Sequence, residues 1–259
     1  MLLMVTACNR NKDNATAVLT EDTDDIEEQA RMDYVFDEMD NFANEAAELG
    51  SVQLKGGVML GNCATVTRDT VSVPHTVEID FGTTNCQCAD GRFRRGKVIV
   101  AYMGNYKDSG FYRNISFSGY HVNDNEVLGG RTITNMGKNS NGDVYYNVSI
   151  NGMMVLNKTG DTMSHTATRT RTWLSGYSTK QLSDDEYMIT GSGSFVRATG
   201  KSATVNITSP LVIAMNCNWI KQGTVQITPA GASHSRVLDY GNGTCDDKAT
   251  ITMNSKTKN

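Results

Sequence analysis

Residues 166–173 alternate strictly with a period of two, and this pattern constrains the fold more than any other in the chain. Every even position from 166 to 172 is Thr, and the odd positions hold Ala167, Arg169, Arg171 and Trp173. Successive side chains of a strand point to opposite faces of a sheet. The segment therefore predicts a strand with one hydroxyl-and-methyl face and one cationic, aromatic face.

Strand patterns and turn signals continue from residue 63 to the C-terminus. The dipeptides that favour hairpin turns are Asp90-Gly91, Asn141-Gly142, Asn151-Gly152 and Asn242-Gly243. No stretch alternates strand with helix, so a parallel sheet is not expected. We predict an all-β fold with about a dozen antiparallel strands, arranged either as a sandwich or as a curved half-barrel.

One amphipathic helix is predicted ahead of the strands, over residues 26–49. Its apolar residues fall on a single stripe: Met32, Val35, Met39, Phe42, Ala46 and Leu49. Acidic residues lie near its start, and Gly50 ends it. The stripe could bind a membrane or a partner, but the acidic polar face has the wrong sign for anionic lipid. We expect the helix to pack on the sheet, so that residues 26–259 form one β-rich domain.

The first eight residues resemble the end of a bacterial lipoprotein signal. Val5-Thr6-Ala7-Cys8 fits the lipobox, which implies cleavage before Cys8 and acylation of its thiol. The basic region and most of the apolar stretch of a signal are missing, so we expect the true start codon to lie upstream. Residues 9–25 are polar and predict a disordered tether. The chain would then be an exported protein of the cell envelope, anchored by lipid to the outer membrane and facing the periplasm or the surface.

Two cysteine-bounded segments repeat along the chain. Each opens with Cys and closes with Asp, an aromatic residue, Gly, three residues and Cys; one runs from Cys63 to Cys86 and the other from Cys217 to Cys245. Exported proteins oxidise their thiols. We therefore predict a disulfide between Cys217 and Cys245 and another from Cys63 to either Cys86 or Cys88, which leaves one spare thiol.

The cysteines and aspartates of these segments allow two other interpretations. Cys86 and Cys88 could chelate zinc, but zinc ligands come as Cys-x(2–4)-Cys, and no second pair or nearby His completes a set. We expect no metal and no cofactor. Asp80 and Asp239, in the Asp-aromatic-Gly units, could be catalytic, but we expect their carboxylates to accept N–H bonds in the following turns.

Much of the region from Cys63 onward is similar to an uncharacterised family of Bacteroidota lipoproteins. The resemblance is carried by Ile79-Asp80-Phe81-Gly82, Asp90-Gly91-Arg92, Arg95-Gly96-Lys97, Arg169-Thr170-Arg171-Thr172-Trp173, Asp185-Glu186-Tyr187-Met188-Ile189-Thr190-Gly191, Ser209-Pro210-Leu211 and Asp239-Tyr240-Gly241-Asn242-Gly243-Thr244-Cys245-Asp246. It implies an exported β-rich lipoprotein and carries no activity with it. Cys88 departs from the family pattern and leaves the partner of Cys63 open.

Arg169, Arg171, Trp173 and Tyr177 are the candidate binding residues. Exposed Arg and aromatic side chains on a rigid sheet can hold sugars or partner proteins. In the alternative interpretation, Trp173 belongs to the core and the arginines pair across strands with Asp or Glu.

No catalytic motif was recognised, and no catalytic residue is proposed. A net charge of −4 argues against a nucleic-acid partner. We predict a non-enzymatic envelope protein with a structural or recognition role, binding a glycan or an envelope protein. The alternatives are a carrier of a hydrophobic ligand in a curved sheet and a hydrolase built from distant carboxylates.

Overall fold

The computed structural model describes residues 28–29, 31–40, 42–43, 46, 63–179, 181–217 and 219–255. The predicted lipidation site Cys8, the tether over residues 9–25 and the predicted helix ends at 26–27 and 47–49 lie outside the described residues.

β-Strands make up most of the described chain. They are β1 (Thr65–Asp69), β2 (His75–Asp80), β3 (Cys86–Gln87), β4 (Phe93–Met103), β5 (Tyr112–Val122), β6 (Asn125–Lys138), β7 (Val144–Val155), β8 (Thr162–Ser175), β9 (Glu186–Val196), β10 (Ser202–Ala214), β11 (Ile220–Pro229), β12 (His234–Asn242) and β13 (Thr250–Ser255), with a short 3-10 helix, η1 (Leu182–Asp184), before β9.

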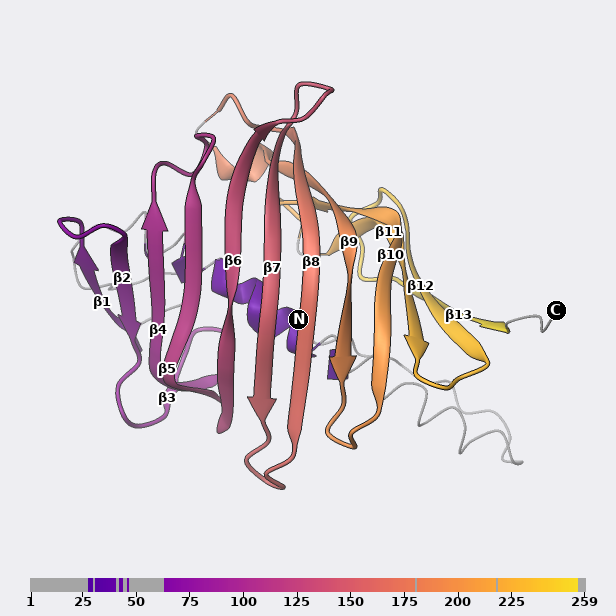
Figure 1. Cartoon of the computed structure of the whole chain (residues 1–259), viewed down its shortest axis with the longest axis horizontal. Helices are drawn as coiled ribbons and strands as arrows, with labels where there is room; N and C mark the ends of the chain where they lie inside the picture. Colours follow the sequence, from indigo (N-terminus) through magenta and orange to yellow (C-terminus); the bar gives the residue numbers. More distant parts are fainter. Residues whose placement is uncertain are drawn as a thin grey trace.

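The strands form one open antiparallel sheet (Figure 1). Their order is β1-β2-β4-β5-β6-β7-β8-β9-β10-β11-β12-β13, and β3 pairs with β4 beside this path. Nearly every strand thus pairs with its neighbours in sequence, as hairpin connections dictate. The all-β prediction is confirmed, and the described strands belong to a single sheet rather than to two stacked sheets.

The helical residues between 28 and 46 lie across one face of the sheet, behind β6, β7 and β8 in Figure 1. We call this covered face the inner face and the opposite one the outer face. The described members of the predicted stripe are at most 2% exposed: Met32, Val35, Met39, Phe42 and Ala46. They belong to one apolar core together with inner-face residues of β2, β4, β5, β6 and β7. The prediction that the helix packs on the sheet is confirmed.

Phe36 of the helix sits directly over Gly152 in β7. A Cβ atom at Gly152 would overlap the Phe36 ring, so only glycine lets the helix approach this closely. The prediction of a hairpin turn at Asn151-Gly152 is therefore wrong, because both residues lie inside β7. Asn141-Gly142 does lie in the turn between β6 and β7, with Gly142 at a φ of +89°.

Both predicted disulfides are present, Cys63–Cys86 and Cys217–Cys245. Cys88 is the free thiol, and it is buried.

The predicted turn role of the two aspartates is also confirmed. The Asp80 carboxylate accepts the N–H of Gly82 at 2.7 Å, and the Asp239 carboxylate accepts the N–H of Gly241 at 2.8 Å.

Candidate binding site

The central strands expose small polar side chains on the outer face. In β8, Thr166 and Thr168 are exposed, whereas Ala167 and Trp173 are buried on the inner face. The alternation continues on the neighbouring strands, whose exposed residues are Asn147, Ser149 and Asn151 in β7, Ser192 and Ser194 in β9, and Thr204 and Asn206 in β10.

Strand register aligns these side chains into rows that run across the strands. One row is Asn151, Thr166, Ser194 and Thr204; the next is Ser149, Thr168, Ser192 and Asn206. Adjacent strands are about 4.8 Å apart, and rows two residues apart along a strand are separated by roughly 7 Å. We call these eight residues the polar grid.

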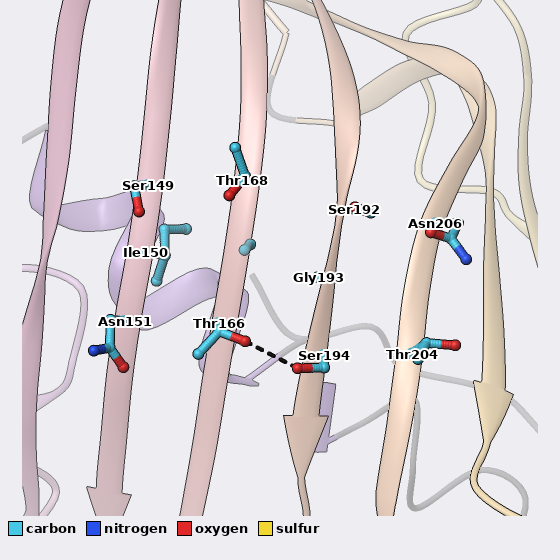
Figure 2. A pocket seen from close by; sticks show the side chains of 11 residues that line it. Ser149, Ile150, Asn151, Thr166, Thr168, Ser192, Gly193, Ser194, Thr204 and Asn206 are labelled. Atoms are coloured by element: carbon cyan, nitrogen blue, oxygen red, sulfur yellow. Dashed lines mark hydrogen bonds between the residues drawn. The ribbon is translucent and has the colours of Figure 1, made fainter.

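The polar grid lines a shallow hollow that is widely open to solvent and has a volume of about 570 Å³ (Figure 2). Ile150, Ala167 and Gly193 complete its lining, and none of the lining residues is charged. Hydroxyl and amide groups both donate and accept hydrogen bonds. The polar hollow therefore offers many neutral hydrogen-bonding groups and no fixed charge.

Most of this hydrogen-bonding capacity is unused within the described protein. Thr166 Oγ1 and Ser194 Oγ lie 2.9 Å apart, the single hydrogen bond drawn in Figure 2. The side chains of the other six grid residues make no hydrogen bond to the described part of the chain. They are free to exchange water for a ligand.

Two glycines of β9 let its backbone lie close to that of β8 at and beside the polar hollow. A Cβ atom at Gly193 would overlap the backbone carbonyl of Thr166, and one at Gly191 would overlap that of Thr168. Glycine in a strand interior permits such close approach between backbones. Beyond the hollow, the register between β9 and β10 shifts after Asn206, which marks an irregularity in the sheet.

The structure does not expose the predicted binding residues Arg169 and Arg171. Arg169 Nη2 donates a 2.6 Å hydrogen bond to Asp33 Oδ1, and Arg171 Nη1 lies 3.6 Å from Asp40 Oδ2. Their side chains are only 15% and 14% exposed. The expectation of an open cationic surface is wrong, because the helix covers these arginines. The alternative, in which the arginines pair with acidic residues of neighbouring strands, is also wrong, because their partners Asp33 and Asp40 belong to the helix.

Trp173 is 3% exposed, so its interpretation as a core residue is confirmed. Its ring centroid is 5.0 Å from that of Tyr187 and 5.2 Å from that of Tyr177. Lys107 Nζ lies 4.8 Å from the Trp173 ring centroid and donates to the Tyr177 carbonyl at 2.6 Å. Of the four predicted binding residues, Tyr177 alone is classed as exposed, at 38%.

Buried ion pairs join the helix to the inner face. Asp40 Oδ1 lies 2.7 Å from Arg113 Nη2, and Asp40 Oδ2 lies 2.7 Å from Arg131 Nη2. Burial acts to raise the pKa of Asp40, but Arg131, Arg113 and Arg171 more than offset it, so the pKa lies below its usual range. The Asp40 carboxylate therefore stabilises the packing of the helix on β5 and β6.

A second buried cluster surrounds Glu38, whose side chain is 1% exposed. Arg94 Nη2 is 3.0 Å from Glu38 Oε2, yet burial is the stronger influence and raises the pKa of Glu38 to about 7. The thiol of Cys88 lies in the same electrostatic environment, and burial raises its pKa. Glu38 and Cys88 are enclosed between the helix and the sheet rather than open to a substrate.

The cysteines do not support the zinc interpretation. Cys86 is bonded to Cys63, so it cannot act with Cys88 as a pair of thiolate ligands. Among the residues that the structure describes, His, Cys, Asp and Glu do not gather in groups of three that could hold a metal ion.

The polar grid was missed by sequence reasoning, although its signal was present. The even-numbered threonines of β8 define one face of the strand, whereas the candidate binding residues Arg169, Arg171 and Trp173 belong to the other. Only the placement of the helix reveals which face stays open.

The fold and the site together define an all-β protein with a helix-covered inner face and a polar, uncharged hollow on its outer face. No family model matches the chain, and neither the curated proteins nor the solved structures include a significant match. None of the described helical segments is long and apolar enough to cross a membrane.

Proposed function

We propose that this chain is an exported, lipid-anchored envelope protein that recognises a glycan or another envelope component through the polar hollow. The observation that carries the proposal is the polar grid: eight aligned, uncharged side chains, six of them without a side-chain hydrogen bond to the described protein. Such a surface suits binding, and no catalytic step is assigned to it.

Export is supported by the cysteine chemistry. Disulfides such as Cys63–Cys86 and Cys217–Cys245 form and persist in oxidising compartments. The resemblance of residues 5–8 to a lipobox and the polar composition of residues 9–25 supply the anchor and the tether. Membership of a Bacteroidota lipoprotein family, which we propose from the motifs between Cys63 and Asp246, would give the same location, the outer membrane.

The two alternative functions have less support. A carrier of a hydrophobic ligand needs an apolar trough, but the inner face is filled by the helix, whose Met32, Phe36 and Phe42 are fully buried. A hydrolase needs carboxylates converging in an open cleft, whereas Asp40 and Glu38 are buried and paired with arginines.

Lipid attachment is tested by labelling cells with an alkyne-bearing fatty acid while they express the protein from its own gene. We expect label on the wild-type chain in the outer-membrane fraction, and none on a Cys8→Ser variant. An unlabelled wild-type chain with reduced cysteines would contradict the proposed export and anchoring.

Recognition is tested by binding of the full chain to isolated envelope material. Thr168→Arg with Ser192→Arg places two large cations in the polar hollow and is expected to abolish binding. Thr65→Arg with Thr67→Arg is the matched control, because both threonines are exposed on β1. Equal binding by the two double variants would contradict a role for the hollow.

A further inference from the structure

We propose that the polar hollow binds an uncharged, extended polysaccharide chain that lies across β7, β8, β9 and β10 and continues onto β6 and β11, at a steep angle to the strands. This inference rests on the proposed recognition function and adds the chemical class and direction of the ligand.

The lining of the hollow selects against other classes of ligand. Phosphate and carboxylate groups are bound by Arg and Lys, and no lining residue is charged. Binding sites for drug-like or apolar molecules are mostly hydrophobic and aromatic, and no aromatic residue lines this hollow. Energetically dominant contacts between proteins favour Trp, Tyr and Arg, with Ser and Thr under-represented. A neutral ligand rich in hydroxyl groups is the class that fits.

The polar rows continue beyond the hollow and give the ligand its direction. The row through Ser149 extends to Thr132 in β6 and to Gln226 in β11. A third row is formed by Thr134, Asn147, Thr170 and Thr190. Across β6 to β11, five steps of about 4.8 Å give a track of about 24 Å. This length suits a chain rather than a single sugar.

Spacing within the rows also suits a polysaccharide. One cross-strand step is close to the length of one hexose unit in an extended glycan, so successive sugars can meet successive strands. On β8, for example, Thr166 and Thr168 lie on either side of such a chain, about 7 Å apart. Each sugar would then contact hydroxyl or amide groups of two rows.

Weak binding per sugar and a strong dependence on chain length follow from this chemistry. A neutral hydrogen bond formed in exchange for water contributes little net binding free energy, and the hollow has no aromatic ring on which a sugar could stack. Affinity should therefore increase with each added sugar until the polar rows are covered, and then level off.

The test is calorimetric titration of the full chain with neutral oligosaccharides from disaccharide to octasaccharide, in β-1,4-glucose, β-1,4-mannose, β-1,4-xylose and α-1,4-glucose series. Oligogalacturonate serves as the charged comparison. We expect at least one neutral series to gain about tenfold or more in affinity from disaccharide to hexasaccharide, equivalent to about 1.4 kcal/mol. We expect little gain beyond that length and no binding of oligogalacturonate.

Variants separate this inference from the proposed function. Thr168→Arg with Ser192→Arg should abolish glycan binding, Thr168→Val should weaken it several-fold, and Thr168→Ser should preserve it. Thr65→Arg with Thr67→Arg should bind as the wild type does. The inference is overturned if Thr168→Arg with Ser192→Arg loses binding to envelope material but the wild type binds none of the neutral oligosaccharides. It is also overturned if the ligand proves to be charged or a protein. In both cases the recognition function stands. If the hollow variant binds envelope material normally, both fall.

Discussion

Arg169 in β8 donates a 2.6 Å hydrogen bond to Asp33 in the helix, and the contact joins residues 136 positions apart. His165 lies four residues earlier on the same face of β8, and its Nε2 atom is 3.1 Å from the same Asp33 oxygen. Burial acts to raise the pKa of Asp33, but Arg169 and His165 more than offset it, and the pKa is lowered. The odd-numbered face of β8 is therefore built to receive the helix, and this leaves the threonine face free for a ligand.

Asp40→Asn is expected to destabilise the fold strongly. The change removes the buried carboxylate that Arg113 and Arg131 share, although Arg131 keeps its pair with Asp37. Breaking a buried pair in this way costs about 3–5 kcal/mol. Chemical denaturation measures the loss. Glu78→Gln is the control, because its partner Lys97 and Glu78 itself are well exposed, and such pairs contribute about 0–1 kcal/mol. Similar losses for the two variants would refute the structural role of the buried pairs.

Stability should respond to the titration of Glu38 at mildly acidic pH. The folded-state pKa is about 7, against an ordinary value of 4.5, so between these values the folded state holds the proton more tightly than the unfolded state. This contribution is fully present below about pH 4.5 and is lost as pH rises toward about 7. Glu38→Gln should remove that fall, as measured by denaturant unfolding across the range. An unchanged pH profile in the variant would show that Glu38 does not titrate there.

Gly152→Ala is expected to disturb the seating of the helix. The added methyl group would overlap the Phe36 ring, and overpacking of this kind costs about 1–3 kcal/mol. The loss should shrink when Phe36 is already Ala, and a double-mutant cycle measures this coupling. Additive losses would mean that the two residues do not touch.

Neighbouring residues of β8 should respond in opposite ways to the same substitution. Ala167 is 6% exposed on the inner face, whereas Thr168 is exposed on the outer face. Ala167→Asp buries an unpaired charge and should unfold the domain or cost several kcal/mol, while Thr168→Asp should change stability by about 0.5 kcal/mol or less. Thermal unfolding of the two variants compares them directly. A more damaging Thr168→Asp would reverse the assignment of the faces.

The fold was largely predictable because its signals are local. The period of two in residues 166–173 specifies a strand, and the stripe from Met32 to Ala46 specifies a packed helix. The repeated cysteine segments supplied both disulfides, although the choice of Cys86 over Cys88 needed the register of β3 against β4.

The open face was not predictable because it depends on a contact between distant segments. Alternation in β8 defines two faces but does not say which one the helix covers. The acidic residues Asp33, Asp37 and Asp40 are the complement of Arg169 and Arg171, and that complementarity was the one signal in the sequence. Asn151-Gly152 was wrongly predicted as a turn because Asn-Gly is also the dipeptide that hairpin turns favour. Here the glycine is needed for a different reason, which is the close packing of Phe36 against Gly152.

Recognition by the outer face is tested most directly by NMR of the full chain with labelled threonine methyl groups, titrated with the neutral hexasaccharides. We predict that the methyl signals of Thr166, Thr168 and Thr204 shift with the same saturation curve, while those of Thr65 and Thr67 on β1 stay in place. Shifts confined to residues outside the polar hollow, or no shift with any neutral hexasaccharide, would contradict it.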